Sequence, residues 1–440
     1  MSDKKMKVVE RGFLVPFILI TSLFFLWGIA NDMTNPMVSA FKKVMPELSN
    51  FQAALVQLAF YGGYATMALP AALFIRKFSY KVAILIGLGL YAVGALLFYP
   101  AAAYEQFSFF LLSLYILTFG LAFLETAANP FILFMGDKKT ATRRLNLAQT
   151  FNPMGSLLGM LIAQLFVIKL LRSAQYTDET YHQLSVAEQA TIRTNDLSLI
   201  SGPYIALGIL ILLMFILIAF VKMPKTQEQT ALTLPETFKK LFKNKRYYNG
   251  VIAQAFYVGA QIMVWTFIFQ YVDNLNASRP ADAQLTATWY NMAAMIMFLS
   301  ARAVSTFLLK YLEPAKLMFL FAIGAIAMSL GTIFIVGIWG LYCLVGISIF
   351  MSLMFPTIYG IALRDMGEEA KIGSAGLVMA IVGGALMPPL QGMVLDIGGP
   401  GFSDVTILGY IPEVNISFAL PLLCFVVIAV YSYRSHKYYL

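Results

Sequence analysis

The sequence predicts an all-helical integral membrane protein in which twelve transmembrane helices form two pseudo-symmetric six-helix bundles. Hydrophobic residues make up 60% of the 440 residues. Charged residues make up only 12%, about half their share in a soluble domain. Apolar runs of about 20 residues, the length that crosses a bilayer, recur along nearly the whole chain. A hydrophilic segment near the middle divides these runs into two sets of six.

The apolar runs predict twelve membrane spans. The first span is too long, and too polar at its far end, to be a cleaved signal peptide, so we expect it to remain as a helix. Both cysteines, Cys343 and Cys424, fall inside spans, where they predict packing rather than disulfides. In chain order, the predicted spans are 12–38, 50–75, 80–101, 107–136, 142–172, 198–222, 247–274, 283–311, 315–335, 337–364, 371–398 and 412–435.

Two longer hydrophilic stretches interrupt the spans. Ser173 to Leu197 predicts an outer loop between spans five and six, and Lys222 to Arg246 joins spans six and seven. The second stretch predicts three parts: an N-terminal bundle, a cytoplasmic linker and a C-terminal bundle, with boundaries 1–222, 223–246 and 247–440. The two halves echo each other weakly, because spans four and ten each carry a proline late in a long helix. Transporters built from such repeats bind their substrate near mid-membrane, where the repeats meet.

The net charge of +9 reflects topology rather than binding to nucleic acid. Of the 31 lysines and arginines, 24 lie near the chain ends or in and beside alternate connections between spans. This asymmetry matches the positive-inside rule for an even number of helices. It predicts a multi-pass protein of the cytoplasmic (inner) membrane with both termini in the cytoplasm.

One carboxyl group interrupts an otherwise apolar segment. Glu125 lies within span four, between Phe107 and Met135. A carboxylate in hydrocarbon costs several kcal/mol unless it is neutralised, paired or hydrated, so such a residue is a functional candidate by default. The alternative is a structural acid that is permanently neutral or paired.

Polar side chains within the spans predict a site for a neutral sugar. Amides and carboxylates hydrogen-bond sugar hydroxyls, and aromatic rings stack on a sugar's apolar face. Amides three or seven residues apart share one flank of a helix. The alternative for each amide is an interhelical hydrogen bond that only holds the bundle together. The predicted substrate contacts are Asn35, Gln57, Glu125, Asn129, Gln149, Asn152, Gln254, Gln261, Trp265 and Asn291.

The sequence also limits the mechanism. No phosphate-binding loop is present, so we expect no ATP hydrolysis, and no cofactor is indicated. The histidines His182 and His436 lie outside the spans, which leaves carboxylates to carry protons. A carboxyl group in an apolar interior binds a proton more tightly than in water, so Glu125 is the first candidate. Arg302 is either a mobile counter-charge or a residue that snorkels to the membrane surface. No enzyme motif, catalytic set or metal site is recognisable.

Several sequence blocks resemble one known family. The segments Leu124-Glu-Thr-Ala-Ala-Asn-Pro130 and Leu145-Asn-Leu-Ala-Gln-Thr-Phe-Asn152 closely resemble the fucose:proton symporter family of the major facilitator superfamily. The resemblance continues through Tyr61-Gly-Gly-Tyr64, Tyr257-Val-Gly-Ala-Gln261 and Phe355-Pro-Thr-Ile358, and it covers nearly the whole chain. It implies two six-helix bundles, alternating access and proton-coupled uptake of a hexose or deoxyhexose. It also implies that Glu125 links substrate and proton, and that Gln149 and Asn152 contact the sugar.

One position departs from the family pattern. Fucose permeases show an aspartate in span one as Asn-x-x-Asp, whereas this chain reads Asp32-x-x-Asn35. Residues three apart face similarly on a helix, so we hypothesise that Asp32 has taken over the coupling role.

Several alternatives stay open at this point. Coupling to H⁺ is expected, but sodium-coupled or uncoupled uptake remains possible, as does specificity for glucose, galactose or an N-acetylhexosamine. A transporter-like sugar sensor is the alternative from a different class, although such proteins usually carry a long soluble extension that this sequence does not show. The expected partners are a small-molecule sugar and the lipid bilayer, and we expect a functional monomer.

Overall fold

A computed structural model describes most of the chain. The described residues are 8–34, 37–45, 48, 50–176, 180–181, 183–223, 234–367, 369–395, 406–407 and 409–439. Within them, twelve helical segments are long and apolar enough to cross a membrane. The prediction of an all-helical protein with twelve spans is therefore confirmed.

The chain separates into two compact units. The N-terminal unit consists of Val9–Met135 and Phe151–Thr230, and the C-terminal unit consists of Met1–Val8, Gly136–Thr150 and Ala231–Leu440. The boundary inside predicted span five falls between Thr150 and Phe151, so the first part of that span belongs to the C-terminal unit. The predicted boundaries of the two bundles and the linker stay a prediction.

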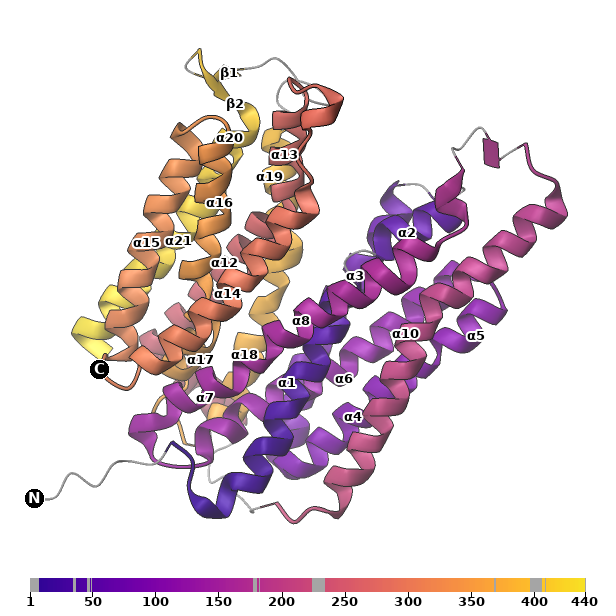
Figure 1. Cartoon of the computed structure of the whole chain (residues 1–440). Helices are drawn as coiled ribbons and strands as arrows, with labels where there is room; N and C mark the ends of the chain where they lie inside the picture. Colours follow the sequence, from indigo (N-terminus) through magenta and orange to yellow (C-terminus); the bar gives the residue numbers. More distant parts are fainter. Residues whose placement is uncertain are drawn as a thin grey trace, which may run out of the picture. The chain divides into compact units, whose positions relative to one another are not determined.

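The N-terminal unit is a bundle of long helices (Figure 1). Within it, α4 and α3 pack against α6, α1 packs against α8, and α10 packs against α4. The elements are η1 (Arg11–Phe13), α1 (Leu14–Thr34), α2 (Met37–Val44), α3 (Asn50–Lys77), α4 (Tyr80–Leu96), α5 (Phe98–Ala103), α6 (Phe107–Phe134), α8 (Phe151–Ile162), the π-helical turn η3 (Ala163–Val167), η4 (Ile168–Leu170), η5 (Ser173–Gln175) and α10 (Val186–Phe220).

Glycines allow α1 and α8 to approach closely. A Cβ added at Gly155 would collide with the carbonyl oxygen of Phe25, and one at Gly159 would collide with that of Ile29. Gly28 meets the backbone of Asn152 in the same way from the α1 side. The sequence pair Gly155 and Gly159, four residues apart, therefore serves helix packing, as small residues commonly do in membranes.

The C-terminal unit is a second helical bundle (Figure 1). In it, α15 packs against α16 and α21, α12 packs against α17, α19 and α21, and α7 contacts α17 and α14. The elements are η2 (Lys138–Thr140), α7 (Ala141–Gln149), α11 (Leu234–Lys243), α12 (Lys245–Thr266), α13 (Ile268–Asn276), η6 (Ala281–Ala283), α14 (Ala287–Leu308), α15 (Pro314–Phe334), α16 (Ile338–Met351), α17 (Met354–Ala362), α18 (Glu369–Met379), η7 (Ala380–Val382), α19 (Gly383–Leu395), β1 (Thr406–Ile407), β2 (Ile411–Pro412), α20 (Glu413–Ser417), α21 (Ala419–Arg434) and the π-helical turn η8 (Ser435–Tyr439).

Several predicted spans are interrupted helices. Span ten is divided into α16 and α17 at Ser352 and Leu353, and span five passes from α7 to α8 at Thr150. Each interruption exposes backbone carbonyls that no longer bond within a continuous helix. Such breaks are tolerated in membranes only where other groups satisfy the backbone.

The predicted outer loop is wrong over part of its length. The sequence predicted a loop from Ser173 to Leu197, but α10 begins at Val186, because Ser185 and Glu188 form a capping box in which each side chain accepts a hydrogen bond from the other residue's backbone. The polar residues that suggested a loop form the start of a helix that is longer than its apolar part. A short antiparallel hairpin, β1 with β2, also lies before span twelve and does not alter the helical class.

Candidate functional site

The candidate coupling residue Glu125 lies on α6 in the interior of the N-terminal unit. Its side chain is 6% exposed. Tyr64 of α3 places its hydroxyl 3.3 Å from Glu125 Oε1 and 3.5 Å from Asn31 Oδ1 of α1. The other carboxyl oxygen, Oε2, is buried without a hydrogen-bond partner among the described residues. One oxygen is thus held by the protein and the other remains available for a proton or a sugar hydroxyl.

Two further predicted residues belong to the same unit. Asn129 follows Glu125 by one helical turn and donates its side-chain N–H to the Glu125 carbonyl at 3.0 Å, so at least part of its role is to support α6. Asp32, on α1, is 9% exposed and lies close enough to Tyr61 of α3 to interact with it electrostatically. The structure places both predicted acids, Glu125 and Asp32, inside the N-terminal unit on helices that contact each other.

The amides of predicted span five have different surroundings. Gln149 ends α7 and is buried, and its backbone carbonyl accepts a hydrogen bond from Arg302. Asn152 is half-buried on α8 and donates to the carbonyl of Phe24 on α1 at 3.2 Å. One N–H of Asn152 therefore makes an interhelical hydrogen bond that holds the bundle together. The side-chain oxygen of Asn152 is not used in that bond.

The C-terminal unit holds a compact polar and aromatic cluster around Trp265, near the end of α12. Its indole N–H donates to Ser348 Oγ of α16 at 3.2 Å, and Asn291 of α14 donates to its carbonyl at 2.9 Å. The Phe298 ring packs edge-on against the indole, with the ring centroids 5.1 Å apart. The predicted sugar contacts Trp265 and Asn291 are thus neighbours.

The remaining predicted amides on α12 differ in burial. Gln254 is fully buried, and neither polar atom of its side chain has a hydrogen-bond partner in the described part of the protein. Gln261 is half-buried. A buried amide without partners is costly, so Gln254 remains a candidate for contact with a polar ligand. Two predicted contacts cannot be placed: Asn35 lies outside the described residues, as does the side chain of Gln57.

Arg302 does not snorkel to the membrane surface. Its side chain is buried, and its guanidinium donates to the carbonyls of Ser352 and, at 2.9 Å, Gln149. The guanidinium also lies over the Phe298 ring, 4.6 Å from the centroid. Its positive charge therefore sits at the carboxyl ends of α7 and α16, where the partial charge of a helix is negative.

Comparison with known proteins now decides the family. The major facilitator superfamily model matches residues 13–388. The chain belongs to this superfamily. Within it, the L-fucose-proton symporter of Haemophilus influenzae is 57% identical over 98% of this chain and 99% of its own length. The L-fucose-proton symporter of Escherichia coli is 33% identical, and the glucose/galactose transporter of Brucella abortus is 30% identical, over 96% and 95% of this chain and 93% of each relative.

Solved structures agree with this assignment. The crystal structure of the E. coli fucose:proton symporter superposes with a TM-score of 0.83 at 31% identity, covering 96% of this chain and 99% of that one. A proton:xylose symporter of the superfamily gives a TM-score of 0.62 at 12% identity, covering 96% and 94%, and shows only the shared fold. The chain therefore belongs to the fucose-proton symporter family of the major facilitator superfamily, whose members are transporters and not enzymes.

In this major facilitator protein, the sequence indicated the acid but not its hydroxyl partner. Tyr64 had no predicted role, although it ends the segment Tyr61-Gly-Gly-Tyr64 that resembles the family. A buried tyrosine hydroxyl needs a hydrogen-bond partner. The sequence could therefore have indicated that Tyr64 needs a partner if it is buried. It could not have identified Glu125 as that partner, because this depends on how α3 packs on α6.

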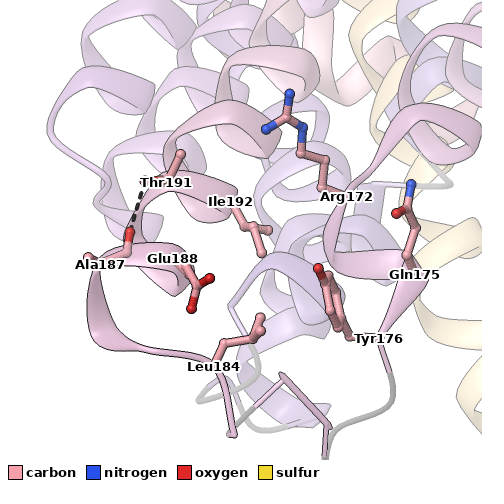
Figure 2. Close-up of a pocket in the computed structure, with 8 residues that line it drawn as sticks. All are labelled: Arg172, Gln175, Tyr176, Leu184, Ala187, Glu188, Thr191 and Ile192. Carbon is pink, nitrogen blue, oxygen red and sulfur yellow. Dashed lines mark hydrogen bonds between the residues drawn. The ribbon is translucent and has the colours of Figure 1, made fainter.

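A surface pocket of about 440 Å³ lies at the start of α10, away from the predicted site residues. Figure 2 shows Arg172, Tyr176 and Glu188 among the side chains that line it, with a hydrogen bond from Thr191 to the Ala187 carbonyl. None of the predicted sugar contacts lines this pocket. In the described part of the chain, no three His, Cys, Asp or Glu side chains gather as metal ligands would.

Proposed function

We propose that this chain imports L-fucose together with a proton by alternating access. The observation that carries the proposal is 57% identity over nearly the full length to an L-fucose-proton symporter. The buried Glu125 carboxyl group, with one oxygen held by Tyr64, is chemically suited to bind and release a proton.

The proposed sugar contacts are the predicted residues, with Asp32 and Glu125 as the coupling acids. Support comes from polar and aromatic side chains in both units: the indole of Trp265 with the amides of Gln149 and Asn291 in the C-terminal unit, and the amide of Asn152 in the N-terminal unit. We place the protein in the cytoplasmic membrane as a monomer with both termini in the cytoplasm, as the distribution of basic residues favours. An impermeant thiol reagent would label Val186→Cys in intact cells but label Lys139→Cys only after permeabilisation.

A second candidate is uptake of glucose or galactose, favoured by the 30% identical Brucella abortus relative. N-acetylhexosamines as substrates, sodium coupling and uncoupled uptake are the remaining options. The lower identity of this relative makes it the weaker guide.

Vesicle uptake separates these candidates. Right-side-out vesicles containing the protein receive labelled fucose under an imposed inward proton gradient, an inward sodium gradient, or neither. We expect accumulation only with the proton gradient. A protonophore should abolish it, and glucose, galactose and N-acetylglucosamine should not compete. Accumulation driven by sodium would contradict it, as would effective competition by glucose. Fucose binding without uptake would indicate a sensor instead.

A further inference from the structure

The buried hydroxyl of Tyr64 has two acceptors and one proton. It lies 3.3 Å from Glu125 Oε1 on α6 and 3.5 Å from Asn31 Oδ1 on α1. The Tyr64 side chain is 1% exposed, so water does not compete for this hydroxyl in the structure. A phenol donates only one hydrogen bond, so it serves either the carboxyl group or the amide, but not both.

The protonation state of Glu125 decides between these two acceptors. An ionised carboxylate only accepts hydrogen bonds, and it attracts the phenol proton more strongly than a neutral amide does. A protonated carboxyl group is itself a donor and can donate to the phenol oxygen. The Tyr64 hydroxyl can then donate its hydrogen bond to Asn31 Oδ1.

We propose that Tyr64 is a positioning residue that reports the protonation of Glu125 on α6 to Asn31 on α1. When Glu125 is ionised, Tyr64 donates to it and Asn31 loses its donor. When Glu125 is protonated, the order of the bonds reverses, and α6, α3 and α1 are joined through one chain of hydrogen bonds. Asn31 directly precedes Asp32, so the state of one proposed coupling acid reaches the neighbour of the other.

The other groups around the pair do not provide this link. Tyr61 of α3 and Tyr91 of α4 lie near Tyr64, and the Tyr91 hydroxyl donates to the Leu26 carbonyl at 3.0 Å. Asp32 of α1 is the other acid, close to Tyr61. The cations on the neighbouring helices, Arg76, Lys77 and Lys81, lie at helix ends. On α3, Arg76 is twelve residues from Tyr64, about 18 Å along the helix axis.

The inference rests on the proposed function, and two variants test it by shifts of opposite sign. Tyr64→Phe removes the donor to the carboxylate, which favours protonated Glu125. The pH at which fucose accumulation is half-maximal should therefore rise by about one unit. Asn31→Leu removes the acceptor that is used only when Glu125 is protonated, so the same half-maximal pH should fall.

Tyr204→Phe is the matched control. Tyr204 is also fully buried in the N-terminal unit and shares one hydrogen bond with Thr34 Oγ1 at 2.9 Å, without contact to Glu125 in the hydrogen bonds described. The pH at which Tyr204→Phe accumulates fucose half-maximally should equal that of the wild type.

The outcomes distinguish this inference from the function on which it depends. Unchanged pH profiles in both Tyr64→Phe and Asn31→Leu would overturn the inference, and so would shifts of both profiles in the same direction. In either case, proton-driven accumulation by the wild type would leave the proposed function intact. Lack of proton-driven accumulation by the wild type would instead contradict the proposed function. If Tyr64→Phe fails to reach the membrane, the Asn31→Leu profile decides alone: a fall supports the inference and no shift overturns it.

Discussion

Glu125 was recognisable from the sequence because a charge within hydrocarbon is costly enough to need a reason. Its surroundings were not recognisable. The chain has 23 tyrosines, and nothing in the local sequence distinguishes Tyr64, which binds a carboxyl group, from Tyr204, which binds a threonine hydroxyl. The difference arises only from the packing of α3 on α6 and of α10 beside α1, and so from contacts between residues that are distant in the chain.

The shifted aspartate gives a prediction at the same scale. If Asp32 has taken over the coupling role of the family's span-one acid, Asp32→Asn should lose most fucose accumulation, because one of the two proposed coupling carboxyl groups is gone. Moving the acid to the family position in the double variant Asp32→Asn/Asn35→Asp should restore part of the accumulation.

Proton-driven uptake of labelled fucose into vesicles measures both variants, with immunodetection to correct for the amount of protein. Wild-type accumulation by Asp32→Asn would show that Asp32 has no coupling role. Loss in the single variant without recovery in the double variant would show that the position of the acid, one turn earlier, is specific to this chain.

At the scale of the helix, spacing predicted which faces meet but not what they bind. Gly155 and Gly159 lie four residues apart, a spacing of small residues that allows close helix contact, and α8 packs closely against α1. The amide spacing placed Gln149 and Asn152 on one flank. The contacts at these residues come from other helices and could not be derived from the spacing: Arg302 of α14 donates to the backbone carbonyl of Gln149, and the Asn152 side chain donates to a carbonyl on α1.

The contact between α1 and α8 gives a prediction for stability. In Gly155→Ala, the new methyl group meets the backbone carbonyl of Phe25, which cannot move without shifting α1. Overpacking of this kind costs about 1–3 kcal/mol. We expect a fall in melting temperature in detergent on the order of 5 °C.

Gly202→Ala is the control for this variant, because a Cβ there meets nothing within 4 Å and Gly202 also lies in a helix of the N-terminal unit. Its melting temperature should stay equal or rise slightly, since alanine favours helix more than glycine does. Equal melting temperatures for the two alanine variants would contradict the close contact of α1 with α8.

Arg302 gives a second prediction at the level of helices. Its guanidinium satisfies carbonyls at the ends of both α7 and α16, and a lysine ammonium lacks the planar fork that reaches two such acceptors at once. The charge-assisted hydrogen bond that is lost is worth about 1.5–3 kcal/mol. Arg302→Lys should therefore melt at a lower temperature and transport fucose more slowly than the wild type.

The control is Arg434→Lys, at the exposed end of α21, which should change neither melting temperature nor uptake. Wild-type melting and uptake in Arg302→Lys would mean that the charge alone, and not the bond to two helix ends, explains a buried arginine at this position.

For the whole molecule, the fold was predictable because a bilayer imposes one length on every spanning helix. Twelve apolar runs therefore predicted twelve spans. The predicted outer loop was wrong because the bilayer does not set the length of a helix beyond its apolar part. There, α10 begins earlier, after the capping box formed by Ser185 and Glu188. The division of the chain at Thr150 was also beyond the sequence, because it depends on the contacts of α7 with α14 and α17.

The central claim for the molecule is that fucose and a proton enter together through Glu125. The most direct measurement is the pH of a weakly buffered medium when fucose is added to right-side-out vesicles, alongside exchange of labelled for unlabelled fucose at equilibrium. The wild type should make the medium more alkaline. Glu125→Gln should exchange fucose without any change in pH, because glutamine can contact a sugar but cannot carry the proton. Alkalinisation by Glu125→Gln equal to that of the wild type would contradict the account.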